Sequence, residues 1–242
     1  MKRRKKNLNK KKKIVVLIPA RGGSKGIKSK NLYLFGTKPL VAWSIETAKN
    51  EKIVDRVFVS TDDKNISFYS RHFGAEVHAR EKKYSGDQSL VSDTIKSFLR
   101  YLKLKFRYIP DILVLLEPTS PFREKKLITK CITKMLKTNS DSIATFKPAK
   151  THPDRCWQID KSGRPVSHSK KKAWKPRQKL KLAYELDGSL YAFKINQKIN
   201  LRKGLLFGKS TSFIYSGENK VEIDDAKDIQ YANYIVENFN EK

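Results

Sequence analysis

The segment from Ile14 to Asn31, IVVLIPARGGSKGIKSKN, constrains the fold of this chain more than any other. It begins with an apolar run, Ile14 to Ile18, which has the length and β-branched content of a buried strand. Glycine lets backbone N–H groups approach an anion closely, and Lys or Arg supplies the opposite charge. The loop after the run contains three glycines and the cations Arg21, Lys25, Lys28 and Lys30. The segment therefore favours a strand followed by a phosphate-binding loop, although its spacing matches neither common nucleotide fingerprint. The alternative is a basic surface loop that joins a strand to a helix.

Patterns typical of strands and helices alternate along the rest of the chain. Apolar runs predict strands at Ile14–Ile18, Val54–Ser60, Ala75–Ala79, Asp111–Leu116, Asp141–Phe146, Ser189–Lys194 and Ser212–Tyr215. Helical spacing and capping residues predict helices at Pro39–Ala48, Asp63–Phe73, Val91–Leu102, Glu124–Leu136 and Asp225–Phe239. Alternation of this kind is typical of a doubly wound α/β sheet with mostly parallel strands.

The length of 242 residues suits one domain with a core of its own. Residues 1–13 form a run of like charges, which predicts a disordered basic tail; an anionic-surface anchor and a nuclear-targeting patch are the alternatives. Residues 14–242 are predicted to form the single domain. Within it, residues 147–182 are polar, carry four prolines and show no clear period. Because long structureless loops are uncommon in compact domains, we expect this excursion to serve as a dimer contact or a substrate lid.

The net charge of the chain is strongly positive. It has 53 Lys and Arg residues against 24 Asp and Glu residues, a formal net charge of +29. Such a charge suits a nucleic-acid binder, but here the excess is spread along the whole chain. We interpret the charge as a field that attracts a polyanionic substrate, and nucleic acid is not a predicted partner.

The N-terminal region has some features of an export signal, because a basic stretch precedes an apolar run. That run is at the lower limit of the ~7–15 residues that such a signal needs, and it leads through Pro19 into a charged loop. We therefore interpret it as the first strand and expect no membrane span and a cytoplasmic location. Cys131 and Cys156 are too few for a disulfide framework, which favours a reducing compartment.

Ligands of open α/β sheets bind at the carboxyl ends of strands. Polar clusters follow four predicted strands, at Arg21–Asn31, Ser60–Asp63, Glu117–Arg123 and Val221–Asp225, and the last two carry further chemistry. LLEPTSPFR carries a carboxylate, two hydroxyls and Arg123 around a proline-fixed turn, which favours an anion or sugar site over simple turn chemistry. VEIDD places Glu222 and Asp224 on one face of an extended segment. Two such carboxylates suit Mg²⁺. The alternative is that these acids stand at a helix N-terminus, where the helix dipole stabilises negative charge. The four histidines are scattered, and no nucleophile-elbow sequence is present.

Seven segments together resemble one family, the acylneuraminate cytidylyltransferases. They are IPARGGSKGIKSKN, PLVAWSI, DRVFVSTDD, FGAEV, LLEPTSPFR, DGSLY and EIDDAKDI, which occur in the family's order between Ile14 and Ile235. Members are CMP–nonulosonic acid synthetases that activate sialic, legionaminic or pseudaminic acid. The resemblance implies a Rossmann-like nucleotidyltransferase domain, a homodimer, and Mg²⁺ or another divalent cation as cofactor. It also implies the reaction: CTP and a 2-keto-3-deoxy sugar acid give the CMP-sugar and pyrophosphate.

The resemblance also implies roles for individual residues. It assigns the nucleotide to Ala20, Arg21, Gly22, Gly23, Ser24, Lys25, Lys30, Asn31 and Asp87. It assigns the sugar acid to Glu117, Thr119, Ser120, Arg123, Arg177, Gln178 and Tyr191. The metal is assigned to Asp224 with Glu222, and catalysis to Arg21, Lys30 and Asp224.

Two departures from the family pattern concern the sugar and the metal. The family's LLQPTSP motif has glutamine where this chain has Glu117, whose charge would repel a sugar carboxylate unless a cation or proton intervenes. Glu117 is therefore a candidate for recognising an amine or an extra hydroxyl. Glu222 stands where the family often has aspartate. A cytidylyltransferase for a Kdo-type or amino-sugar acid is the alternative enzyme, and a non-catalytic protein that binds nucleic acid or another anion is the alternative from a different class.

Overall fold

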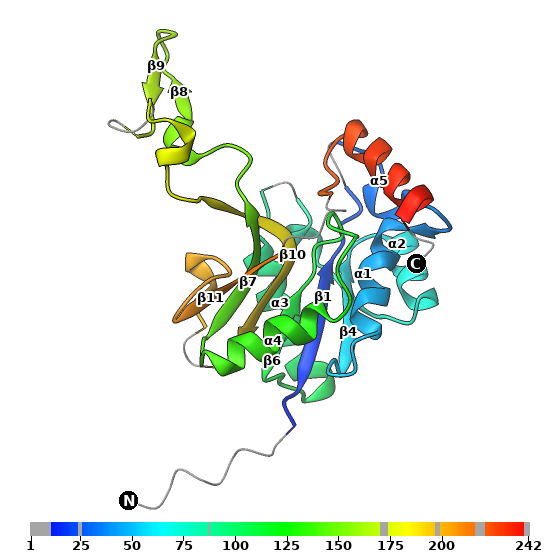
Figure 1. Cartoon of the computed structure of the whole chain (residues 1–242). Helices are drawn as coiled ribbons and strands as arrows, with labels where there is room; N and C mark the ends of the chain where they lie inside the picture. Colours follow the sequence, from blue (N-terminus) through cyan, green and yellow to red (C-terminus); the bar gives the residue numbers. More distant parts are fainter. Residues whose placement is uncertain are drawn as a thin grey trace, which may run out of the picture.

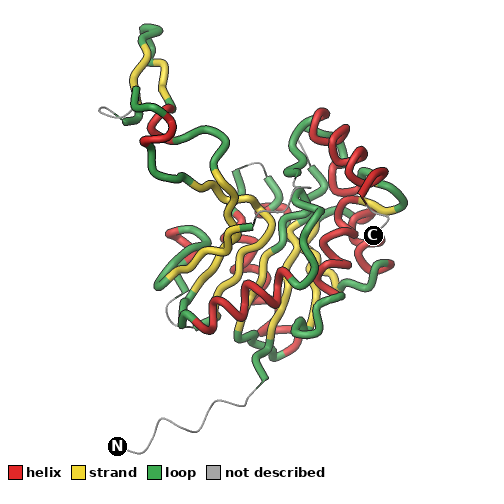
Figure 2. The backbone as a smooth tube through the Cα atoms, in the orientation of Figure 1, coloured by secondary structure: helices red, strands yellow, loops and turns green. Residues whose placement is uncertain are grey.

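The computed structural model describes residues 11–23, 26–86, 88–169, 174–196, 199–215 and 221–239 of the chain. A central sheet lies between layers of helices, and an arm extends away from it (Figures 1 and 2). Residues 1–10 of the predicted tail lie outside the described residues, so its disorder stays a prediction. None of the helices in the described ranges has the length and apolar content needed to cross a membrane.

The sheet has seven strands in the order β11-β7-β10-β6-β1-β4-β5. Only β10 is antiparallel to its neighbours, β6 and β7; the other pairs are parallel. The predicted doubly wound, mostly parallel sheet is therefore confirmed. The strands are β1 (Ile14–Pro19), β4 (Arg56–Thr61), β5 (Glu76–Ala79), β6 (Ile112–Leu115), β7 (Ser142–Pro148), β10 (Tyr184–Lys194) and β11 (Ser210–Ile214).

Helices cover both faces of the sheet because alternate residues of the buried strands point to opposite sides. Val16 and Ile18 of β1 pack in one core with α1 (Leu40–Lys49), α2 (Lys64–His72) and α4 (Leu127–Lys137). Val15 and Leu17 pack in the other core with α3 (Val91–Phe106). The last helix, α5 (Ala226–Phe239), packs with Phe35 and Leu40, beside the short strands β2 (Leu34–Phe35) and β3 (Lys38–Pro39).

Most predicted boundaries are close to the observed ones, and the differences have local causes. The run Thr61-Asp62-Asp63 offers three candidate N-caps for α2, and the cap is Asp63, whose Oδ1 accepts a hydrogen bond from the backbone N–H of Ile66 at 2.8 Å. Helix α4 begins at Leu127, three residues after the predicted start, because Lys126 has a left-handed backbone with φ of 64°. Helix α3 extends beyond the predicted Leu102 to Phe106, and Arg107, which follows it as the C-cap, is also left-handed.

The excursion predicted at 147–182 is an arm that begins at the end of β7 and returns at the start of β10 (Figure 1). It contains regular structure that its sequence did not indicate, including the antiparallel hairpin of β8 (Trp157–Ile159) and β9 (Pro165–Ser167). Two short 3-10 helices, η3 (Pro153–Arg155) and η4 (Arg177–Lys179), flank the hairpin. The hairpin residues are mostly exposed on both faces, so they lack the alternation that marks a half-buried strand.

Candidate functional site

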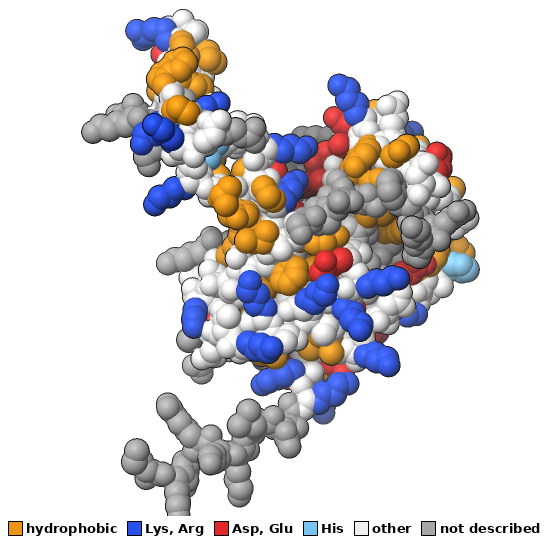
Figure 3. Space-filling view, viewed as in Figure 1, with side chains coloured by type: hydrophobic (Ala, Val, Ile, Leu, Met, Phe, Trp, Pro, Cys, Tyr) orange, Lys and Arg blue, Asp and Glu red, His pale blue; other side chains and the backbone are white. Residues whose placement is uncertain are grey.

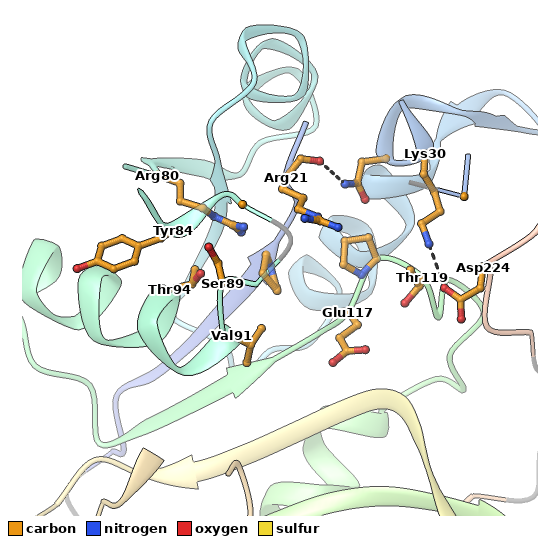
Figure 4. Close-up of a pocket in the computed structure, with 15 residues that line it drawn as sticks. Arg21, Lys30, Arg80, Tyr84, Ser89, Val91, Thr94, Glu117, Thr119 and Asp224 are labelled. Carbon is orange, nitrogen blue, oxygen red and sulfur yellow. Dashed lines mark hydrogen bonds and ion pairs between the residues drawn. The ribbon is translucent and has the colours of Figure 1, made fainter. Parts of the chain in front are cut away.

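A cavity of about 450 Å³ lies at the carboxyl ends of β1, β5 and β6, where α/β sheets bind ligands (Figure 4). Its walls come from the loop after β1, from Arg80 after β5, from the start of α3 and from the loop after β6. The lining residues are Pro19, Arg21, Gly26, Lys30, Asn31, Arg80, Tyr84, Gly86, Ser89, Val91, Thr94, Glu117, Pro118, Thr119 and Asp224. The predicted loop and the predicted carboxylate segment thus meet at one cavity, which we call the first cavity.

Hydrogen bonds and close packing hold the loop after β1 in place. The N–H of Ala20 donates to the carbonyl of Ser60 at 2.9 Å, and the side-chain amide of Asn31 donates to the carbonyl of Arg21 at 2.9 Å. A Cβ at Gly22 would lie 2.9 Å from Cβ of Asp63, so this position has no room for a side chain. Gly23 has open space around it. The Arg21 side chain points into the first cavity (Figure 4).

Three predicted nucleotide-binding residues, Ser24, Lys25 and Asp87, lie outside the described residues. Their contacts with the nucleotide therefore stay predictions. Gly86, which lines the first cavity immediately before Asp87, places that part of the chain at the cavity mouth.

Lys30 and Asp224, 194 residues apart, form an ion pair at the edge of the first cavity (Figure 4). Nζ of Lys30 lies 3.1 Å from Oδ1 of Asp224 and also donates to the carbonyl of Ile223 at 2.8 Å. A Cβ at Gly26 would lie 2.6 Å from the carbonyl oxygen of Asp224, so glycine is needed for this close approach. The loop after β1 and the segment before α5 therefore brace each other, and they orient one cation toward one carboxylate.

A second cavity of about 440 Å³ lies next to the first, and Asp224 lines both. Figure 3 shows carboxylates beside lysines in the space between the base of the arm and α5. The residues that line this second cavity are Ser120, Phe122, Lys147, Pro148, Lys150, Asp187, Ser189, Val221, Glu222, Asp224, Asp228 and Tyr231. The predicted metal residue Glu222 and the predicted sugar residue Ser120 both belong to it.

Glu117, Ser120 and Glu222 converge on Gly188 of β10. A Cβ at Gly188 would lie 3.1 Å from Oε2 of Glu117, 3.0 Å from Oγ of Ser120 and 3.5 Å from Oε1 of Glu222. Burial, and then the charge of Glu222, raise the pKa of Glu117 to about 7, against the opposing effect of Arg123. Burial and Asp224 also raise the pKa of Glu222. Glu117 is therefore present in both its protonated and its ionised form near neutral pH.

Arg123 lines neither the first nor the second cavity but connects the chain segments around them by hydrogen bonds. Its nitrogens donate to the carbonyl of Ser189 at 2.7 Å, to Oγ of Ser44 at 2.9 Å and to the carbonyl of Glu117 at 2.6 Å. Burial lowers the pKa of Arg123 to about 10, which leaves it charged at neutral pH. Its predicted contact with a sugar stays a prediction, whereas its contacts with the loop after β6 and with β10 are direct.

The remaining predicted sugar residues lie in different surroundings. Thr119 lines the first cavity, and its carbonyl accepts from the N–H of Ile223 at 2.8 Å. Tyr191 is 8% exposed and packs in the core under β10, where burial raises its pKa. Gln178 is exposed on the arm, and of Arg177 only the backbone is described. Of the described side chains, Tyr191 and Gln178 line neither cavity, because Tyr191 is in the core and Gln178 lies on the arm, which projects away from the sheet.

The carboxylates at the two cavities fit a divalent cation whose remaining ligands come from a substrate. Within the described ranges no group of three or more His, Cys, Asp or Glu side chains could hold a metal ion alone. Mg²⁺, however, is usually bound by one or two carboxylates together with substrate phosphates. Asp224 and Glu222 supply two carboxylates at the second cavity, and Asp224 also faces the first.

Sequence reasoning missed three cations that line the cavities, namely Arg80, Lys147 and Lys150. Arg80 follows β5 directly, so the rule that ligands bind at carboxyl ends of strands would have identified it. Lys147 lies in β7 at the second cavity, where its Nζ is 3.5 Å from Oε1 of Glu185 and 4.0 Å from Oε2 of Glu222. No motif marks Lys147, because it stands where the predicted strand ends and the aperiodic stretch 147–182 begins.

The fold and the cationic loop together are typical of an α/β protein that binds a nucleotide, and the cation-lined first cavity adjoins a second cavity lined by carboxylates and lysines. Comparison with known proteins makes this class specific. The sequence model of the family described as "Cytidylyltransferase" matches residues 15–206, and the chain belongs to this family.

Relatives agree with this assignment, and a solved structure shares the fold. The chain is 33% identical over 223 residues to N-acylneuraminate cytidylyltransferase A of Danio rerio, covering 87% of this chain and 48% of that protein, so it spans about half its length. It is 32% identical over 199 residues to CMP-N,N'-diacetyllegionaminic acid synthase of Legionella pneumophila, covering 77% of this chain and 80% of that protein. The structure of CMP:2-keto-3-deoxy-manno-octonic acid synthetase complexed with CTP has the same fold, with a TM-score of 0.66, 16% identity and coverage of 93% and 98%.

Proposed function

We propose that this protein transfers CMP from CTP to the anomeric hydroxyl of a nonulosonic, sialic-acid-like 2-keto-3-deoxy sugar acid and releases pyrophosphate. One observation carries the proposal: Asp224, paired with Lys30, stands between a cation-lined cavity and an adjoining cavity with carboxylates and two lysines. The first suits a nucleoside triphosphate and the second suits a sugar acid. The names of the relatives, which act on acylneuraminic and diacetyllegionaminic acids, support the same substrate class.

In-line displacement at phosphorus needs positioned charges more than covalent chemistry. Arg21, Lys30 and Arg80 line the first cavity, so they can hold the triphosphate and offset the charge that develops on the leaving pyrophosphate. Lys147 and Lys150 line the second cavity and can hold the carboxylate of the sugar acid. Asp224 faces both cavities, so a triphosphate in the first and a sugar acid in the second would bring the α-phosphate and the attacking hydroxyl beside it.

We further propose that Asp224 and Glu222 hold Mg²⁺ or another divalent cation. When bound, the ion would neutralise phosphate charge and orient the triphosphate. The like-charge effect of Asp224 on the pKa of Glu222 supports this role, since a cation between the two would relieve their repulsion. Lys30 would then hold Asp224 in place through its ion pair.

A homodimer in the cytoplasm completes the proposal. The arm carries apolar side chains on its surface, including Trp174 at 88% exposed and Leu182 at 83% exposed, which supports contact with a second copy. Trp157 packs against Trp174 with ring centroids 5.8 Å apart, so this surface is organised within one chain. Both cysteines are free, which is consistent with the cytoplasm.

An amino-sugar acid is the alternative substrate, and the acidic lining favours it specifically. Glu117, Asp187 and Glu222 lie near one another around Gly188, so a cationic substituent on the sugar would be attracted there. A Kdo-type acid has no such substituent to offer. The alternative thus differs from the main proposal in the sugar and leaves the nucleotide chemistry unchanged.

Pyrophosphate release tests the proposal. Purified protein, CTP and Mg²⁺ are mixed with N-acetylneuraminic, legionaminic, pseudaminic, Kdo-type or amino-sugar acids in turn. We expect pyrophosphate release when the sugar is a nonulosonic acid. We expect none when another nucleoside triphosphate replaces CTP. Release only with an amino-sugar acid or a Kdo-type acid would support the alternative, and CTP binding that weakens steeply with salt without any turnover would favour a non-catalytic anion-binding protein.

A further inference from the structure

Arg80 is held at the wall of the first cavity by two hydrogen bonds to a single residue. Its Nη2 donates to the carbonyl of Ser60 at 2.7 Å, and its Nε donates to Oγ of Ser60 at 3.2 Å. Arg80 is 9% exposed, and its guanidinium points toward the same space as that of Arg21 (Figure 4). Because a guanidinium is planar and rigid, two bonds to one partner fix its orientation.

The hydroxyl of Ser60 has a second partner behind the cavity. Its Oγ lies 3.0 Å from Nδ1 of His78, and both residues are buried. Since Oγ accepts from Arg80, we assign its own hydrogen to His78, which makes Nδ1 the acceptor and places the ring proton on Nε2. Burial, and then the charge of Arg80, lower the pKa of His78 to about 4, so the ring is neutral and able to accept at neutral pH.

The ring of His78 is itself held by the core. It packs edge-on against Phe98 at 5.5 Å between centroids and lies tilted against Tyr101 at 5.0 Å. Both aromatic residues belong to α3, whose first turn contributes Val91 and Thr94 to the first cavity. His78 does not line the cavity, so any influence that it has on a ligand must pass through Ser60 and Arg80.

We propose that His78 is a positioning residue for nucleotide binding, which acts through Ser60 to fix the guanidinium of Arg80 at the wall of the first cavity. The inference rests on the proposed function, because it takes CTP as the ligand of that cavity. Without the acceptor on His78, the Ser60 hydroxyl has to turn toward another partner, and its lone pairs are no longer aimed at Arg80. Arg80 then has orientational freedom that CTP must remove on binding, which weakens the complex.

Two substitutions of His78 separate the acceptor from the ring. His78→Phe keeps an aromatic ring between Phe98 and Tyr101 but removes Nδ1, whereas His78→Asn loses the ring and offers an amide oxygen to Ser60. We measure the Kd of CTP by calorimetry without sugar acid, and then kcat and both KM values. His78→Phe should raise the Kd and KM of CTP on the order of 10-fold, the loss expected for a hydrogen bond to a charged group, and leave the KM of the sugar acid unchanged.

His78→Asn should stay within about 3-fold of the wild-type Kd, although it leaves a larger cavity and therefore lowers Tm more than His78→Phe. A purely structural role for His78 predicts the opposite order, in which CTP affinity follows Tm. Ser70→Ala is the matched control, because Ser70 is also fully buried, its Oγ donates to the carbonyl of Ile66 at 2.6 Å, and it lines neither cavity. It should lower Tm and leave the Kd of CTP unchanged.

Ser60→Ala provides an independent measurement if His78→Phe fails to fold. It removes the hydroxyl that connects His78 to Arg80 and should raise the Kd of CTP by a similar factor. The double variant, His78→Phe with Ser60→Ala, should bind CTP no more weakly than Ser60→Ala alone. A wild-type Kd in His78→Phe, or additive losses in the double variant, would overturn this inference while CTP binding by the wild type stands. Failure of the wild type to bind CTP would overturn the proposed function and this inference together.

Discussion

Replacing Glu117 with glutamine should remove a pH-dependent loss of stability from the folded protein. The pKa of Glu117 rises from 4.5 to about 7 in the folded state, because of burial and the neighbouring Glu222. Between these two values the folded protein binds a proton that the unfolded chain has released. Stability therefore decreases as pH rises through this window and is constant, as far as this group is concerned, below 4.5 and above 7.

The size of the effect follows from the same values. Each pKa unit is worth about 1.36 kcal/mol, so ionised Glu117 costs the folded state about 3 kcal/mol above pH 7 and almost nothing below pH 4.5. Glutamine has nearly the same shape and stays neutral throughout. The free energy of unfolding of Glu117→Gln, relative to the wild type, should therefore increase by about 2.5 kcal/mol between pH 5 and pH 8.

Urea denaturation followed by circular dichroism at the two pH values measures this difference, with EDTA present so that no divalent cation bridges the carboxylates. Glu237→Gln, an exposed position on α5, is the matched control and should show no pH-dependent advantage over the wild type. An equal difference between Glu117→Gln and the wild type at both pH values would refute the reasoning. It would mean that Glu117 ionises in the folded protein as it does in the unfolded chain.

Four further results are expected. Asp224→Asn should leave Tm nearly unchanged and lower turnover by about 100-fold or more, so near-normal turnover at saturating Mg²⁺ would remove Asp224 from the site. Arg123→Met should lower the free energy of unfolding in urea by about 3 kcal/mol or more, since three buried acceptors lose their donor, and a loss below 1 kcal/mol would contradict this role. Trp174→Ser should raise the dimer dissociation constant at least about 30-fold in sedimentation equilibrium, and an unchanged constant would place the interface elsewhere. A thiol reagent should modify Cys156 in the native protein but reach Cys131 only after unfolding, because Cys131 is buried and burial raises its pKa; equal rates at both would contradict the core packing.

The sequence was most informative where local pattern and position in the sheet coincide. The run before Pro19 and the alternating acids of VEIDD predicted a strand and a carboxylate face, and the rule for strand ends then brought Lys30 and Asp224 to one edge. The hairpin of the arm lacked a signal because neither of its faces packs on a core. A short strand shows alternating apolar and polar residues only when one of its faces packs against other parts of the protein.

The bracing contacts of the site could not be predicted for a different reason. Arg123 was expected to meet a ligand because of its motif, but its donors are directed to Ser189, Ser44 and the Glu117 carbonyl. Those partners come from three separate elements, and no local spacing encodes such a meeting. His78 likewise looked like one of several scattered histidines until the register of β4 and β5 paired it with Ser60.

The arm is attached to the body through residues that also line the second cavity. The arm joins the body through β7 and β10, whose ladder pairs Pro148 with Tyr184 and Lys147 with Glu185. Both strands continue into the central sheet, and the register of their pairing shifts between Leu186 and Tyr191. Pro148 and Lys147 are also part of the cavity wall. The base of the arm is thus also part of the wall of the second cavity, so a substitution at Lys147 or Pro148 would alter the attachment of the arm and the lining of the cavity together.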